Sequence, residues 1–364
     1  MTLGEPTSLA DDLLARLPGS PDAYPQKIDL NSRMVLLVQF DAGAYRSASF
    51  LDDRILGLQT KGAWVPLSRA AEASQLVANA RPIHFIFHTG HVGSTLVSRL
   101  LDETGEVLSL REPLPLRTLA EAGDALGRSD SLLSNSEFDS TLAMFMRLWS
   151  RGYGATRSVV VKATSSAGRL AAPILAANPG SRAIYMNLRA EPYLATLLAG
   201  QNSPTDLRGH GPERMRRLHS RMGAAFAPLH TLSIGELAAM SWLAESWTQR
   251  EAVVRFAGRV IALDFDPFLS TVAESMGRIL RHFGLCADAR YLAQMERSPV
   301  LTRYSKAPEH AYSPSLRAEI LSDSRRRNRE EIRKGMAWLE QQARSDPSVA
   351  EMVNGAGGSS RPHA

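Results

Sequence analysis

Two glycines three residues apart, followed by Ser and Thr, form the stretch of this chain best suited to chemistry. The stretch reads Gly90-His91-Val92-Gly93-Ser94-Thr95. Glycines allow a tight turn whose successive backbone N–H groups point inward, and a helix that begins there adds the positive end of its dipole. A turn of this kind binds anionic oxygens. We therefore predict a phosphate-binding loop over these six residues.

The flanking residues predict the elements that hold this loop. The run from Ile83 to Phe87 is mostly apolar and predicts a buried strand, and apolar residues recur at helical spacing from Val92 to Leu101. The whole is therefore strand, glycine turn and helix. A turn that joins a buried strand to a buried helix without any ligand is the alternative that this pattern leaves open.

The loop differs from the ATP-binding Walker A pattern. That pattern needs a Gly five residues before its closing Gly-Lys-Ser/Thr, and here His88 occupies the first Gly position. Ser94 occupies the position of the lysine. The usual contact to the β- and γ-phosphates is therefore missing.

The same residues resemble the 5′-phosphosulfate loop of the sulfotransferases, which in bacterial members often reads Pro-(Arg/Lys)-Ser-Gly-Thr-Thr-Leu-Leu. This chain has His91 where that family usually has Arg or Lys. The resemblance covers, with gaps, about residues 83–310. It implies 3′-phosphoadenosine 5′-phosphosulfate (PAPS) as co-substrate, held by the six loop residues, adenosine 3′,5′-bisphosphate as product, and no metal.

The rest of the chain alternates apolar strands with helical patterns. Further strands are expected at Val107–Leu110, Ser158–Lys162, Arg182–Leu188 and Arg259–Phe265. This order predicts an α/β fold: a P-loop NTPase-like parallel sheet of about five strands flanked by helices, with a small N-terminal elaboration. Ligands collect at the carboxyl ends of parallel strands. The polar residues at those ends are Glu112, Lys162, Arg189 and Asp264.

Sulfuryl transfer needs an in-line acceptor, stabilisation of developing charge and a base for the acceptor proton. Glu112 lies 21 residues after His91, where several sulfotransferase branches have a catalytic Glu. The resemblance therefore implies Glu112 as general base. The alternative is a structural carboxylate at a helix N-terminus, just before Pro113.

The resemblance also implies the remaining site residues. Lys162 matches a family lysine that contacts the sulfuryl group or the departing phosphate, and His91 can donate a hydrogen bond to a transferring oxygen. Arg189 opens a stretch similar to the family's 3′-phosphate motif, with Thr196 in place of its serine. Arg303 and Lys306 fall where the family has a basic loop that closes over the nucleotide.

Composition limits the partners and the compartment. The net charge of +5 and the pI of about 9.5 suit anionic ligands, but the basic residues are scattered, so nucleic acid is not expected. The single Cys286 excludes internal disulfides and argues against a structural zinc site. No apolar run reaches about 18 residues. We expect a cytoplasmic protein that does not span a membrane, with a small-molecule or peptide acceptor.

We expect three regions along the chain. Residues 1–80 form a loosely attached arm of about 30 residues and the small elaboration, 81–345 form the α/β domain, and 346–364 form a disordered tail. Residues 203–233 are predicted as a solvated basic helix, with a lid over an anionic ligand as the alternative. The acceptor, the oligomeric state and the effect of His91 on activity cannot be read from the sequence.

Two other functions stay open at this stage. A P-loop kinase or NTPase would use ATP and magnesium, with Asp264 after an apolar strand as the metal-binding carboxylate. A non-catalytic nucleotide-binding module would keep the fold without turnover.

Overall fold

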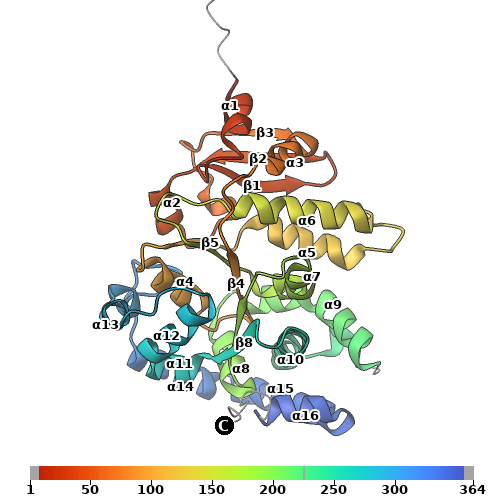
Figure 1. Cartoon of the computed structure of the whole chain (residues 1–364). Coiled ribbons are helices and arrows are strands. Elements are labelled where there is room, and N and C mark those ends of the chain that lie inside the picture. Colours follow the sequence, from red (N-terminus) through yellow and green to blue (C-terminus); the bar gives the residue numbers. More distant parts are fainter. Residues whose placement is uncertain (1–7, 224–225, 356–364) are drawn as a thin grey trace, which may run out of the picture.

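A five-stranded parallel sheet lies at the centre of the computed structural model, which describes residues 8–223 and 226–355 (Figure 1). The strands are β4 (Ile83–His88), β5 (Val107–Arg111), β6 (Ser158–Lys162), β7 (Ala183–Asn187) and β8 (Val260–Asp264). Their spatial order is β5-β6-β4-β7-β8, and all neighbours are parallel. The predicted α/β fold is confirmed. Strand β4 is central, and the strands that follow it in the chain lie on both sides of it. Sheets of this kind bind ligands beyond the carboxyl end of such a strand.

The central strands are buried on both faces, which explains their continuous apolar runs. Phe85 and Phe87 of β4 pack into one core with Val159 and Val161 of β6. The alternate residues, Ile86 among them, pack into a second core on the other face of the sheet. Strand β4 is therefore held rigidly on both sides, and the loop that follows it starts from a fixed point.

Helices cover both faces of this sheet (Figure 1). They are α4 (Ser94–Asp102), α5 (Leu114–Ala125), α6 (Asn135–Trp149), α7 (Ala171–Ala177), α8 (Ala190–Ala199), α9 (Ser203–Met222), α10 (Ile234–Arg255), α11 (Phe265–Ser270), α12 (Val272–His282), α13 (Ala289–Glu296), α14 (Pro314–Arg327), α15 (Arg329–Ser345) and α16 (Pro347–Val353). Short 3-10 turns are η1 (Asp53–Ile55), η2 (Ser165–Leu170), η3 (Leu229–Thr231) and η4 (Pro299–Thr302). No helix among the described residues has the length and apolar character that a membrane span requires.

The N-terminal region is a second, antiparallel sheet, drawn in red and orange in Figure 1. It contains α1 (Leu9–Arg16), β1 (Ala23–Asp29), β2 (Met34–Gln39), α2 (Ala42–Ser47), β3 (Gly62–Pro66) and α3 (Leu67–Gln75), with strand order β1-β2-β3. The prediction of a loose arm over residues 1–30 is wrong for its described part, because Leu13, Leu17 and Tyr24 are buried. These residues join the core on one face of the parallel sheet.

The structure also corrects the expectations for two later segments. The predicted disordered tail begins with helix α16, whose Val349 is fully buried, and residues 356–364 lie outside the described residues. The predicted solvated helix is α9, but its Arg214 is buried and Arg217 pairs with the buried Glu245 of α10, with 2.7 Å between Nη2 and Oε1. A buried carboxylate on the facing helix draws these two arginines inward, which periodicity alone does not reveal.

Candidate functional site

The loop after β4 follows a left-handed path that the sequence pattern anticipated. Gly90, His91 and Gly93 have φ angles of 109°, 54° and 73°. Gly93 is needed for a second reason as well, because a Cβ at this position would collide with the ring of Phe265. His91 takes up a left-handed conformation without being glycine, which costs about 1 kcal/mol or more. Strain of this size is typical of functional sites.

Six consecutive backbone N–H groups of this loop, those of residues 91–96, donate no hydrogen bond to any described residue. Ser94, Thr95 and Leu96 form the first turn of α4, whose N–H groups cannot be satisfied within the helix. The hydroxyl of Thr95 is also buried without a partner. Unpaired buried donors at a helix N-terminus attract an anion.

His88 fixes the start of the loop, a role that the sequence did not suggest. Its Nδ1 accepts from the Gly90 amide at 3.1 Å, so Nε2 carries the proton and donates to the carbonyl of Ala163 at 2.8 Å. Burial, reinforced by the nearby positive charges of Lys162 and Lys306, lowers the pKa of His88 well below its usual value. The neutral ring therefore anchors the loop to the end of β6. The Gly90 amide is paired, so it is not one of the unpaired amides of the loop.

Glu112 and Lys162 form an ion pair at the ends of β5 and β6, as their predicted positions at strand ends suggested. Lys162 is fully buried, and the Glu112 side chain is 14% exposed. The amide of Glu112 donates to the carbonyl of Lys162 at 2.6 Å, and Glu112 has a φ of 55°. Burial lowers the pKa of Lys162 to about 8, although the charge of Glu112 opposes the shift.

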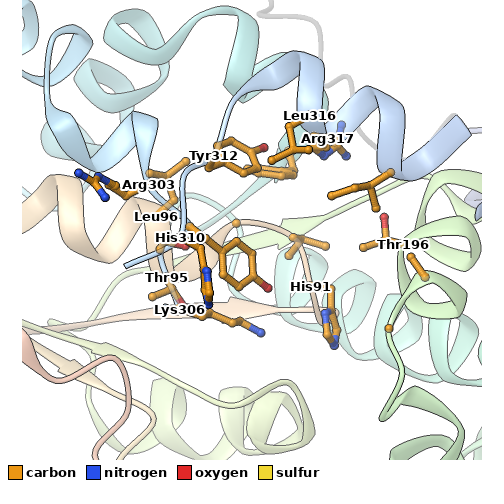
Figure 2. Close-up of a pocket in the computed structure, with 18 of the residues that line it drawn as sticks. His91, Thr95, Leu96, Thr196, Arg303, Lys306, His310, Tyr312, Leu316 and Arg317 are labelled. Atoms are coloured by element: carbon orange, nitrogen blue, oxygen red, sulfur yellow. The ribbon is translucent and has the colours of Figure 1, made fainter. Parts of the chain in front are cut away.

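A cavity of about 500 Å³ opens over the loop (Figure 2). It is bounded by the loop, α8, the first residue of α11, residues 303–312 and α14. Thr196, Arg303 and Lys306, all predicted site residues, line it. Figure 2 shows the ammonium group of Lys306 pointing toward His91, whereas Arg303 extends away from the other labelled side chains.

The opposite wall of the cavity is largely apolar and aromatic. Phe265, Tyr312 and Leu316 line it, and no motif in the sequence pointed to a function for them. The hydroxyl of Tyr312 is buried without a partner, so it can still bond to a ligand. Arg317 lies at this wall as well, held by Asp266 at 2.7 Å between Nη2 and Oδ1. The cavity thus combines the loop amides and several cationic side chains with a largely apolar wall.

Two residues at the ends of β7 and β8 lie elsewhere. Arg189 is exposed at the start of α8 and does not line the cavity. Asp264 caps α11 by accepting from the Asp266 amide at 3.0 Å, and burial raises its pKa although the charge of Arg189 opposes the shift. The described residues contain no group of three or more His, Cys, Asp or Glu side chains placed to hold a metal ion.

The charge state of His91 predicts that anion binding at this site depends on pH. Enclosure in the site, together with the charges of Lys306 and Lys162, lowers the pKa of His91 to about 4. The ring still contacts solvent, so water screens part of this shift. A bound dianion raises the pKa again, so binding takes up a proton and is favoured as the pH falls.

We therefore expect sulfate, which stays a dianion over this range, to bind more tightly at pH 5.5 than at pH 8, and the His91 ring signals in NMR spectra to titrate at a higher pH when sulfate is bound. The His91→Ala variant should show a smaller dependence on pH. A pKa of His91 that bound sulfate does not change would contradict a role of this ring beside the anion.

Comparisons with known proteins find similarity at the level of structure. No protein-family model matches the sequence, and no curated protein is found to be similar to it. A sulfotransferase from Mycobacterium avium superposes with a TM-score of 0.39 at 13% identity, over 89% of this chain and 97% of that one. One from Alicyclobacillus acidocaldarius gives 0.38 at 15% identity, over 75% and 100%. The sulfotransferase domain from the curacin biosynthetic pathway gives 0.37 at 13%, over 65% and 85%.

These matches are to sulfotransferases by name and concern the fold alone. With TM-scores of 0.37–0.39 and identities of 13–15%, they leave the activity of this chain to be inferred from its own residues.

Proposed function

We propose that this protein is a sulfotransferase that transfers a sulfuryl group from PAPS to a hydroxyl or amine of a small-molecule or peptide acceptor. The observation that carries the proposal is the run of unpaired amides at residues 91–96, with Lys162 and Glu112 on the neighbouring strands. The loop resemblance supports the same class of reaction. The single Cys286 suits a reducing, cytoplasmic compartment.

The site has the size and chemistry that a nucleotide with two phosphate groups requires. A cavity of about 500 Å³ falls within the range of cofactor pockets, about 300–1,000 Å³. Phe265 and Tyr312 offer apolar surface for a base, and the loop amides with Lys306 offer donors for phosphate oxygens. Arg303 and Thr196 complete the lining, while Arg189 would have to reach the ligand from outside the cavity.

Bound PAPS would supply an activated sulfuryl group and a phosphate leaving group. The loop amides bind the oxygens on which negative charge increases, and they are held in place before the reaction, so no reorganisation is needed. Glu112 accepts the proton of the acceptor. Lys162 neutralises the charge of the phosphate leaving group. To do so, Lys162 has to break its ion pair with Glu112 and pair with the phosphate instead.

The proposal is tested by thermal unfolding with nucleotides. Adenosine 3′,5′-bisphosphate without magnesium should raise the melting temperature, because a ligand at 100 times its Kd stabilises the native state by about 2.7 kcal/mol. A Lys306→Met variant should need more ligand for the same rise. Stabilisation by ATP with magnesium, but not by the bisphosphate, would instead favour a kinase or NTPase. Stabilisation by the bisphosphate without any turnover of PAPS over a panel of acceptors would favour a binding module.

A further inference from the structure

Arg99 in helix α4 bonds three separate parts of the chain to one another. Its Nε donates to the carbonyl of Ser305 at 2.8 Å. Its two terminal nitrogens donate to the carbonyls of Arg46 at 3.3 Å and Ser47 at 3.4 Å, and to the hydroxyl of Ser49 at 2.8 Å. One guanidinium group thus ties the helix behind the amide loop both to residues 303–312 and to the N-terminal region.

The bond to Ser305 matters because the next residue is Lys306. The segment 303–312 is otherwise closed mainly on itself: the amide of Tyr304 donates to the carbonyl of His310 at 2.9 Å, and Arg303 pairs with Ala311 in an isolated bridge. Arg99 fixes this segment relative to α4. Lys306 lines the cavity that opens over the amide loop, and its ammonium group points toward His91 (Figure 2).

The N-terminal residues that Arg99 holds are also bonded to the turn that carries Glu112. Arg111 is buried, and its Nη1 donates to the carbonyls of Tyr45 at 2.9 Å and Ala48 at 2.7 Å. The amide of Leu51 donates to the carbonyl of Arg111 at 2.7 Å, directly before Glu112. The segment 45–51 therefore links the side of the site that holds Lys306 to the side that holds Glu112.

We propose that Arg99 is a positioning residue that holds Lys306 over the amide loop. Through segment 45–51, Arg99 also fixes the position of Lys306 relative to Glu112. The role of Lys306 in this inference rests on the proposed nucleotide site. Arginine suits the task because its planar fork has five donors, and here it bonds to several acceptors that a single ammonium group could not reach together. Burial lowers the pKa of Arg99, and the carbonyl groups solvate its charge.

The first test is a double-mutant cycle on nucleotide affinity. Arg99→Met and Lys306→Met should each weaken the binding of adenosine 3′,5′-bisphosphate, measured by calorimetry, by about tenfold. The double variant should bind about as weakly as Lys306→Met alone, because Arg99 acts through Lys306. Arg99→Lys should recover part of the affinity. Arg297→Met removes an exposed arginine outside the site and should bind as wild type.

If Arg99 affects binding by a route that does not involve Lys306, the losses in the double variant multiply, and that result overturns the inference, as does a folded Arg99→Met variant that binds like wild type. Urea unfolding of each variant shows that the binding is measured on folded protein.

The second test does not need the nucleotide. A lysine-specific endoprotease should cleave after Lys306 of the folded Arg99→Met variant about tenfold faster than in wild type or Arg297→Met, because the segment opens locally. Unchanged cleavage overturns the inference. If wild type fails to bind the bisphosphate while Arg99→Met is still cleaved faster, the proposed function fails and the positioning of this segment by Arg99 stands.

Discussion

The Glu112→Gln variant is expected to lose about 10²–10⁴-fold in the turnover of sulfuryl transfer, which is what a general base contributes. Its affinity for adenosine 3′,5′-bisphosphate should not fall, because Glu112 does not line the nucleotide cavity and competes with the phosphate for Lys162. The amide of glutamine keeps the size of the carboxylate but cannot take the acceptor proton. Steady-state kinetics with PAPS and calorimetry with the bisphosphate measure the two quantities.

Stability has to be separated from chemistry in this experiment. Glu112→Gln leaves the buried Lys162 without its partner, which costs about 3–5 kcal/mol for a buried pair. The double variant Glu112→Gln with Lys162→Met removes the unpaired charge, so it should recover stability in urea unfolding but not turnover. Glu106→Gln is a matched control. Glu106 directly precedes the same strand and pairs with the exposed Arg157. Wild-type turnover in folded Glu112→Gln would leave Glu112 a purely structural carboxylate.

Gly93→Ala is expected to abolish nucleotide binding and to destabilise the protein. The residue has a φ of 73°, and its new Cβ would collide with the ring of Phe265. Backbone strain alone costs about 1–3 kcal/mol, and displacing Phe265 or the loop moves the amides away from a common centre. Urea unfolding and calorimetry with the bisphosphate measure both effects.

Gly105→Ala is the matched control for backbone strain. Gly105 has a φ of 68°, and a Cβ there meets no atom within 4 Å. The free energy of unfolding of this variant should therefore fall only by the cost of the left-handed conformation, about 1 kcal/mol, and its nucleotide affinity should not change. Adding Phe265→Ala to Gly93→Ala should recover part of the lost stability by removing the clash. Wild-type affinity in Gly93→Ala would contradict the role of this loop.

Buried apolar runs made the parallel sheet predictable. Ser158–Lys162 was expected as a strand and is β6. Its three valines are fully buried, and such a continuous apolar run is typical of a strand that packs against helices on both faces. Strand β1 was missed, since its Pro25, Gln26 and Lys27 have no strand-like pattern and its burial comes from neighbours distant in the sequence. The charged stretch over about 315–344 predicts a single helix from its sequence, but the structure breaks it at Asn328 into α14 and α15, and no Gly or Pro marks this break.

One part of the site was predictable because position along a strand fixes position in space. Glu112 and Lys162 meet because both end neighbouring strands. Arg189 ends a strand on the other side of β4, and its side chain is exposed. No role for His88 or Arg99 could be read from the sequence. Their roles depend on carbonyl groups of Ala163 and Ser305, which no local pattern can reveal.

The most direct test of the account is a titration of isotope-labelled protein with adenosine 3′,5′-bisphosphate, followed in ¹H–¹⁵N NMR spectra. The amides of residues 91–96 donate to no described residue in the free protein. Hydrogen bonds to phosphate oxygens should move their proton signals downfield together and slow their exchange with solvent, while the Gly90 amide, already bonded to His88, changes little. Signals of residues 91–96 that remain in place at saturating nucleotide would contradict the account.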